Sequence, residues 1–263
     1  MRFPMKILLT NDDGIEAPGL WALIHALEVN HDLLVAAPAS EKSASSHSIS
    51  LGHEFVVEEL GPGRFAVHGT PADCVKFALS ELKADFVPDL LISGINPGPN
   101  TGVSVYYSGT ISAAREGLIN GIPALAVSVG SKISPEFDYA CSFVQMLLEG
   151  YQEGSLPRDI LLNVNIPSLP ESEIRGVKVA RQARSRFIEE FSLENVRGRK
   201  RIYSLAGEIE VSDPDGTTDE EVLREGFVAI TPLKLDQTDY SSISNLEKWA
   251  KEKKAPWPHP KNI

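Results

Sequence analysis

The stretch Lys6-Ile7-Leu8-Leu9-Thr10-Asn11-Asp12-Asp13-Gly14 decides how this chain can fold. It joins a short apolar run to a polar turn, which is typical of a buried strand that ends at the edge of a sheet. The same pattern recurs along the first two thirds of the chain, and helical patterns separate its copies. The expected strands are 6–10, 33–37, 89–93, 124–129 and 160–166, and the expected helices are 18–28, 72–82, 112–119 and 137–148. Apolar strands that alternate with helices indicate a mostly parallel sheet covered on both faces.

We therefore predict an α/β fold over residues 1–168, with a Rossmann-like, three-layer, mostly parallel sheet that carries helices on both faces. After residue 168 the helical alternation is lost. The remainder, 169–263, is expected to be a β-rich extension with a swapped arm or hairpin and a terminal helix at 242–253, while a strand within 226–233 returns to the core. An extension too thin to hold its own core is often completed by a partner subunit. We expect a partner subunit to complete this extension.

Composition limits the possible partners. The formal net charge of −11 repels polyanions, so we expect no extended nucleic-acid footprint. No apolar run reaches membrane-spanning length or forms a signal-peptide core, and Cys74 and Cys141 lie far apart in apolar sequence, which predicts reduced thiols and a cytoplasmic protein. The acidic run from Glu208 to Glu225 is expected to be a solvated loop without a catalytic role.

Asp12 and Asp13 are the first candidates for chemistry. Ligands of open α/β sheets bind beyond the carboxyl ends of the strands, which is where these carboxylates stand. Neighbouring strand side chains point to opposite faces, so both can reach one ion only if the backbone turns, and Gly14 permits that turn. Carboxylates joined by hydroxyl and amide oxygens suit a hard cation, Mg²⁺ or Mn²⁺. The alternative interpretation is that Asp13 only shapes the turn before Pro18.

Two further segments predict an anion site. The stretch from Ser93 to Gly102 is rich in turn formers, so we expect an irregular loop that presents backbone N–H groups to a ligand. Ser108-Gly109-Thr110 opens the next helix, and a helix N-terminus flanked by hydroxyls binds anions, although the same residues also suit a simple helix cap. Asp73 is interpreted as structural, at the first turn of its helix.

Several other catalytic patterns are missing from the sequence. There is no G-x-S-x-G elbow and no G-x-x-x-x-G-K-[ST] loop, and only His47 of the histidines falls in a candidate ligand loop. Asp12 and Asp13 also lack the D-x-D spacing of phosphatases that use an aspartyl nucleophile. This favours direct attack by a metal-activated water.

Five ordered motifs together resemble the SurE family, the survival-protein-E nucleotidases. They are residues 8–19 (LLTNDDGIEAPG), 69–74 (GTPADC), 93–96 with 100–102 (SGIN and NTG), 107–110 (YSGT) and 226–233 (GFVAITPL). The loop 42–47 reads Lys-Ser-Ala-Ser-Ser-His where the family commonly has Arg-Ser-Gly-Ala-Ser-Asn, and Ala39 replaces an acidic residue often found there.

The resemblance implies hydrolysis of nucleoside 5′-monophosphates, and of 3′-monophosphates, with one Mg²⁺ or Mn²⁺ per subunit. It also implies a homodimer or homotetramer whose subunits exchange their C-terminal arms. It places the metal on Asp12, Asp13, Ser43 and Asn96, with Ser45 and Ser46 as alternative hydroxyls to Ser43, and it places Asn11, Asn100, Ser108, Gly109 and Thr110 around the phosphate. Our mechanistic hypothesis is that an aspartate, preferably Asp13, accepts the proton of the attacking water. Alternatives are a polyphosphatase or other small-metabolite phosphatase, and a nucleotide-binding sensor or glycosyltransferase-like module.

Overall fold

The structure is a computed structural model that describes residues 3–82, 84, 86–131, 133 and 135–253. It divides the chain into two compact units, Met1–Leu233 and Lys234–Ile263. Each unit is described by itself.

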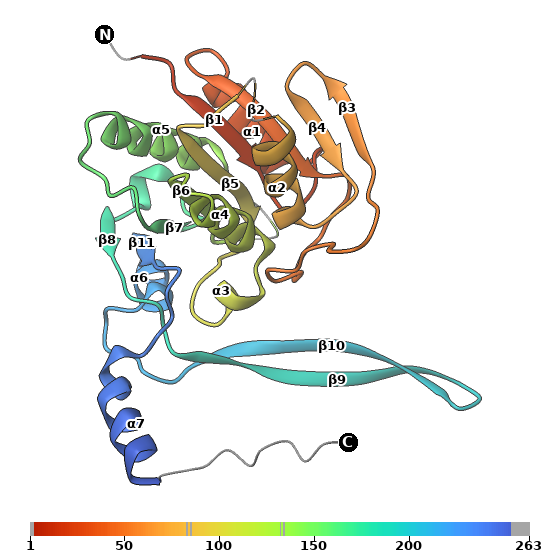
Figure 1. Cartoon of the computed structure of the whole chain (residues 1–263), viewed down its shortest axis with the longest axis vertical. Coiled ribbons are helices and arrows are strands. Elements are labelled where there is room, and N and C mark those ends of the chain that lie inside the picture. Colours follow the sequence, from red (N-terminus) through yellow and green to blue (C-terminus); the bar gives the residue numbers. More distant parts are fainter. Residues whose placement is uncertain (1–2, 83, 85, 132, 134, 254–263) are drawn as a thin grey trace. The chain divides into compact units, whose positions relative to one another are not determined.

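A sheet of nine strands forms the centre of the first unit, in the order β3-β4-β2-β1-β5-β6-β7-β11-β8 (Figure 1). Six strands run parallel: β1 (Lys6–Thr10), β2 (Asp32–Pro38), β4 (Arg64–Val67), β5 (Leu90–Pro97), β6 (Ala124–Val129) and β7 (Leu161–Ile166). At one edge β3 (Val57–Gly61) is antiparallel to β4; at the other, β11 (Val228–Leu233) is antiparallel to β7 and parallel to β8 (Val177–Val179). The late strand β11 thus extends the same sheet.

Helices cover both faces of this sheet. On one face α1 (Pro18–Leu27) and α5 (Asp138–Gln152) pack against Ile7 and Leu9 of β1, whereas α2 (Pro71–Glu81) and α4 (Gly109–Ile119) pack on the other face against Leu8. Successive strand side chains point to opposite faces, so an apolar run such as Ile7-Leu8-Leu9 feeds both cores. The predicted three-layer α/β fold is confirmed.

The structure corrects the local predictions at three places. Ser93–Pro97 continues β5 instead of forming an irregular loop; the register with β6 shifts between Ser93 and Asn96, and this irregularity accommodates the turn formers within the strand. Helix α4 begins at Gly109, as the Ser108-Gly109-Thr110 motif indicated but three residues before the start of the expected helix 112–119, and it follows the short helix α3 (Ser104–Tyr107). The strands β3 and β4 were not predicted, because the glutamates of β3 hide its strand pattern and β4 is only four residues long.

A further correction concerns the acidic run. Glu208 and Glu210 lie in strand β10 (Lys200–Val211), and Asp219 starts a short helix, α6 (Asp219–Arg224), where its side chain is fully buried. The prediction of a loop was therefore wrong for these residues. The predicted exposure to solvent was wrong for Asp219, whereas Glu208 and Glu210 are exposed. Burial of Asp219 is possible because backbone N–H groups donate to its carboxylate.

The expected hairpin is formed by β9 (Ser185–Arg197) and β10 (Lys200–Val211), which pair with each other as a separate two-stranded sheet. Figure 1 shows it projecting from the rest of this unit as a long ribbon. Several of its large apolar side chains are exposed, among them Phe191, Leu193, Val196, Tyr203 and Leu205.

The second unit contains α7 (Tyr240–Lys253), which begins two residues before the expected helix. Asp239 accepts hydrogen bonds from Ser241 and Ser242 at its start. Across the described residues, no helix is long and apolar enough to cross a membrane. Cys74 and Cys141 are free and buried, as expected.

Candidate active site

A cavity of about 490 Å³ lies beyond the carboxyl ends of β1 and β5. Its lining comprises Asp12, Asp13, Glu41, Ser43, Ala44, Asn96, Pro97, Pro99, Asn100, Val103, Ser104, Tyr107, Ser108, Phe187 and Ile209. This edge of the sheet is where open α/β folds bind ligands, and the volume suits a small molecule. Six of the predicted site residues, from four separate loops, therefore share one cavity. A larger cavity of about 600 Å³ lies at the amino ends of β1 and β2, lined by residues such as His31 and Gln145 and by none of the predicted ones.

Asp12 is held by the N-terminus of α4. The Thr110 hydroxyl donates a hydrogen bond to the Asp12 carboxylate at a distance of 2.5 Å. The backbone N–H groups of Gly109 and Thr110 also donate to this carboxylate. Burial raises the pKa of Asp12, and these hydrogen bonds oppose that rise. Gly109 and Thr110 thus lie behind Asp12, so the positive end of the helix dipole faces a protein carboxylate.

The close approach of α4 to Asp12 requires a glycine at position 109. A Cβ atom on Gly109 would lie 2.6 Å from the Asp12 Cβ and 2.8 Å from its Oδ2, far inside van der Waals contact. Ser108 caps the helix by accepting the Ile111 N–H at 3.1 Å, and its side chain also lines the cavity. Ser108 is thus both a helix cap and a cavity residue.

The turn that carries both aspartates is fixed by Asn11. Its side-chain amide donates to the Gly14 carbonyl at 2.8 Å and its side-chain oxygen accepts the Gly14 N–H at 3.2 Å, with Gly14 at a φ of 110°. Asn11 is buried and does not line the cavity. Asn11 shapes the backbone turn that directs Asp12 and Asp13 toward the cavity. Its influence on the site is therefore indirect, instead of the predicted contact with phosphate.

Asn96 and Ser43 present oxygen atoms beside the two aspartates. The Asn96 Nδ2 donates to the Gly98 carbonyl at 2.6 Å, which leaves its side-chain oxygen for a ligand. The Ser43 hydroxyl donates to Glu41 at 2.7 Å and keeps its lone pairs. Carboxylate, hydroxyl and amide oxygens around one cavity are the donor set that fits a hard divalent cation.

Charge in the cavity also fits a cation. Asp12, Asp13 and Glu41 line it, and its described lining contains no Lys, Arg or His. A phosphate placed there without a cation would meet only negative charge, which costs free energy at these separations. Among described residues, no group of three His, Cys, Asp or Glu side chains could hold a metal. A metal here would rely on two carboxylates and neutral oxygens, as the sequence predicted.

The loop that carries Ser43 is anchored on both sides. The Lys42 N–H donates to the Asp12 carbonyl at 2.7 Å, and Ser46 donates from its N–H to the Tyr107 carbonyl at 3.0 Å and from its hydroxyl to the Tyr106 carbonyl at 2.8 Å. Ala44 and Ser46 have φ angles of 56° and 52°, a left-handed conformation that costs a non-glycine residue free energy. The anchors compensate for that cost.

His47 and Ser50 supply the remaining anchors. His47 Nε2 lies 2.9 Å from Oε2 of the buried Glu116 in α4, whose Oε1 also lies 2.8 Å from Lys76 Nζ. Burial on its own raises the pKa of Glu116, but the hydrogen bonds from His47 and Lys76 lower it overall. Ser50 donates to Asp73 from its N–H at 2.9 Å and its hydroxyl at 2.7 Å. Asp73 also completes a capping box with Thr70, which agrees with the structural interpretation.

Asn100 is positioned by the neighbouring strands. Its N–H donates to the Asn165 side chain at 2.8 Å, its side-chain amide donates to the Ser128 hydroxyl at 2.9 Å, and its carbonyl accepts from Asn163 at 2.8 Å. These bonds leave its side-chain oxygen and one amide hydrogen for the cavity.

Sequence reasoning missed four participants: Glu41, Phe187 and Ile209 in the lining, and Glu116 behind the Ser43 loop. The sequence offered a signal for Glu41, because its carboxylate is two residues before the candidate ligand Ser43 and can reach the Ser43 hydroxyl. The others come from a hairpin and a helix whose packing on the site has no local sequence signature.

Comparison with known proteins identifies the family of the chain. A family model described as Survival protein SurE matches residues 7–189. The chain is 43% identical over 253 residues to a Desulfatibacillum aliphaticivorans protein named 5'-nucleotidase SurE, covering 95% of this chain and 100% of that one, and 44% identical over 248 residues to a Geotalea daltonii protein of the same name, covering 93% and 99%. The crystal structure of the Sure protein from Aquifex aeolicus is similar with a TM-score of 0.81 and 34% identity, over 93% of this chain and 99% of that one. The chain therefore belongs to the SurE family.

Proposed function

We propose that this protein is a metal-dependent 5′-nucleotidase that hydrolyses nucleoside 5′-monophosphates, and also 3′-monophosphates, to nucleoside and phosphate. The observation that carries the proposal is the cavity beyond β1 and β5, where oxygen donors and three carboxylates surround a volume that suits a small ligand. The relatives named 5'-nucleotidase SurE support the same reaction. An acidic cavity binds a phosphate ester only when a cation joins the two.

We assign one divalent cation per subunit, Mg²⁺ or Mn²⁺, to Asp12, Asp13, Ser43 and Asn96. When bound, it supplies positive charge that neutralises the phosphate and acidifies a nearby water. Asp12 is the rigid member of this set, because α4 holds its carboxylate by three donors. Asp13 is half-buried and lines the cavity.

In the proposed reaction Asp13 accepts a proton from the attacking water, whose oxygen forms a bond to phosphorus as the ester P–O bond breaks. The departing nucleoside oxygen takes a proton from solvent. The Ser108 hydroxyl and the remaining Asn100 amide hydrogen donate to phosphate oxygens, whose charge shifts in the transition state. No covalent enzyme intermediate forms, so oxygen from labelled water appears in the released phosphate and not in an aspartate.

Phosphate release from a substrate panel tests the proposal. The panel contains 5′- and 3′-nucleoside monophosphates, ribose 5-phosphate and polyphosphate, each with Mg²⁺, with Mn²⁺ and with chelator. We expect turnover of the nucleotides that chelator abolishes. Preference for polyphosphate would replace the nucleotidase proposal with a polyphosphatase, and nucleotide binding without turnover under every metal would replace it with a sensor.

We also propose that the β9–β10 hairpin mediates assembly into a homodimer or homotetramer. Its support is the row of exposed apolar side chains such as Leu193 and Leu205 on strands that pair only with each other. Exposed apolar patches of this kind mark interaction sites. Light scattering of the wild type and of Leu193→Asp tests it: a change to monomer in the variant is expected, and an unchanged mass contradicts the assignment.

A further inference from the structure

Two apolar side chains of the hairpin reach the cavity. Phe187 of β9 and Ile209 of β10 both line it, and they face each other in the antiparallel register of the hairpin. Phe187 is half-buried, whereas Ile209 is 40% exposed. The cavity therefore has two contrasting parts, an oxygen-rich part with the aspartates and an apolar part that includes the hairpin.

The Phe187 ring is held across its partner strand. A Cβ atom on Gly207 would lie 2.8 Å from Cε1 and Cζ of Phe187, so the ring lies over the glycine backbone. Phe187 lies directly opposite Ile209 on β10, and Gly207 is two residues before Ile209. The Phe187 ring therefore packs diagonally across the hairpin onto Gly207. This packing leaves the ring with a flat apolar surface in a defined place at the cavity.

The base of the hairpin is fastened to the cavity loop. The Val103 N–H donates to the Ser185 hydroxyl at 2.7 Å, the Gly102 N–H donates to Oδ2 of the buried Asp219 at 3.1 Å, and Gln182 donates to the Gly102 carbonyl at 2.7 Å. Ala183 donates to the other Asp219 oxygen at 2.9 Å. The start of β9 is thus fixed three residues from Asn100, where Ser185 binds Val103, so the position of Phe187 relative to the phosphate contacts is set by the fold.

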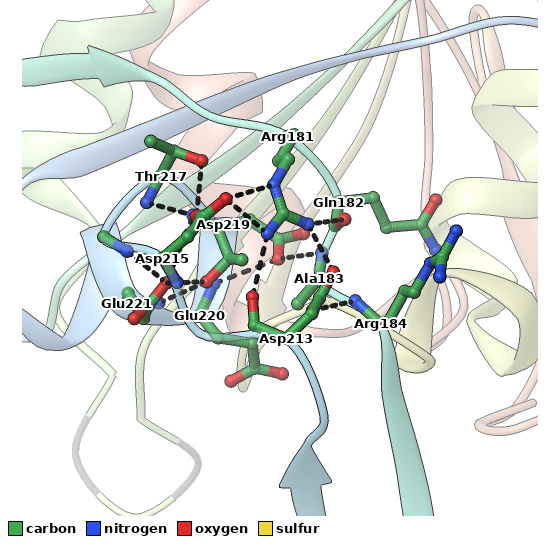
Figure 2. Close-up of polar contacts among 12 residues, drawn as sticks. Arg181, Gln182, Ala183, Arg184, Asp213, Asp215, Thr217, Asp219, Glu220 and Glu221 are labelled. Carbon is green, nitrogen blue, oxygen red and sulfur yellow. Dashed lines mark hydrogen bonds and ion pairs between the residues drawn. The ribbon is translucent and has the colours of Figure 1, made fainter.

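An ion-pair cluster reinforces this connection (Figure 2). The Arg181 guanidinium lies 2.7 Å from Asp213 and 2.8 Å from Asp215, which joins the chain before β9 to the chain after β10. Asp213 also accepts the Arg184 N–H at 2.8 Å. Both ends of the hairpin are therefore held beside Asp219.

We propose that Phe187 sets the preference for nucleotides over phosphate esters that lack a base, by packing its ring against the base of the bound nucleotide, with Ile209 completing the apolar wall. This inference rests on the proposed function, because it concerns the nucleoside part of the same substrate. Apart from Asp12, Asp13 and Glu41, the described lining of the cavity carries no charged side chain. The base therefore contacts the wall by stacking on the Phe187 ring. Every base can stack in this way, so we expect the site to accept nucleotides with different bases.

The test compares substrates with and without a base, under the metal that supports turnover. For Phe187→Ala we expect KM for AMP to rise about tenfold, within the range that aromatic stacking supplies, while kcat/KM for ribose 5-phosphate stays at the wild-type value. The matched control is Phe191→Ala, which removes a ring four residues along the same strand and outside the cavity lining and should change neither substrate. Equal loss on both substrates, or no change with AMP, overturns the inference.

A binding measurement keeps this test separate from the proposed chemistry. The Phe187→Trp variant places an indole beside the cavity, and we expect AMP to quench its fluorescence more than that of the wild type, while ribose 5-phosphate does not. Quenching without hydrolysis would support the base contact and reject the nucleotidase reaction. Hydrolysis of AMP without added quenching would support the reaction and reject the base contact.

Discussion

Substitution of Gly109 by alanine should displace Asp12 without unfolding the protein. The added Cβ would lie 2.6 Å from the Asp12 Cβ, whereas ordinary carbon contacts need about 3.5 to 4.0 Å. Helix α4 or the Asp12 side chain must therefore move by roughly 1 Å. The neighbouring Thr110 bond to Asp12 would lengthen or break, and the carboxylate would lose its fixed place in the cavity.

A displacement of this size at a catalytic group lowers activity by about 100-fold. Stability should change far less, by under about 2 kcal/mol, because alanine is a better helix former than glycine and offsets part of the steric cost. The assay is kcat/KM for AMP together with Mn²⁺ affinity and urea unfolding. The matched control is Gly150→Ala, a helical glycine whose added Cβ would meet the Leu156 and Ser155 side chains at distances of 3.0 Å and more, away from the cavity. Wild-type activity and metal affinity in Gly109→Ala would refute the role assigned to α4.

The remaining predictions concern residues that position the site. Glu116→Gln should weaken Mn²⁺ binding several-fold, because it loosens His47 and hence the loop that carries Ser43, while the nucleotide contacts stay intact. A Mn²⁺ titration checks this prediction, and an unchanged Mn²⁺ affinity would contradict it. Asp73→Asn should cost about 1 to 2 kcal/mol of unfolding free energy at pH 7. Burial alone raises the pKa of Asp73, but hydrogen bonds from Ser50 and Thr70 lower it overall from its ordinary value of 3.8, so this stabilisation is full above that value and is lost as pH falls through the lowered pKa. Urea unfolding at pH 7 and in acid should show that the difference in unfolding free energy between wild type and Asp73→Asn shrinks at low pH. A difference that stays constant with pH would contradict this prediction.

Much of the architecture follows from short-range patterns in the sequence. The runs Ile7–Leu9 and Ala124–Val127 are apolar at every position because helices cover both faces of their strands, and this alone indicates a parallel sheet. Asp12 and Asp13 stand directly after such a run, so their place at the carboxyl edge could be predicted as well. Strand β3 escaped prediction because one flank of an edge strand faces solvent and carries glutamates.

The roles of site residues depend on contacts that sequence does not show. Thr110 has the local pattern of an anion-binding helix start, yet its hydroxyl donates to Asp12, 98 residues earlier in the chain. Asn11 has both side-chain polar atoms bound to Gly14, so its effect on the site is through the backbone. Phe187 lines the cavity because Ser185 and Asp219 fasten the hairpin there, a consequence of tertiary packing alone.

The most direct test of the metal-dependent hydrolase is Mn²⁺ binding and AMP hydrolysis measured together for the wild type, Asp13→Asn and the control Asp138→Asn, an exposed aspartate at the start of α5. The account predicts one Mn²⁺ per chain in wild type and control, with turnover that follows metal occupancy. In Asp13→Asn it predicts affinity at least about 10-fold weaker and turnover at least about 100-fold slower. Turnover in chelator, or an Asp13→Asn variant that binds Mn²⁺ and hydrolyses AMP like the wild type, would contradict it.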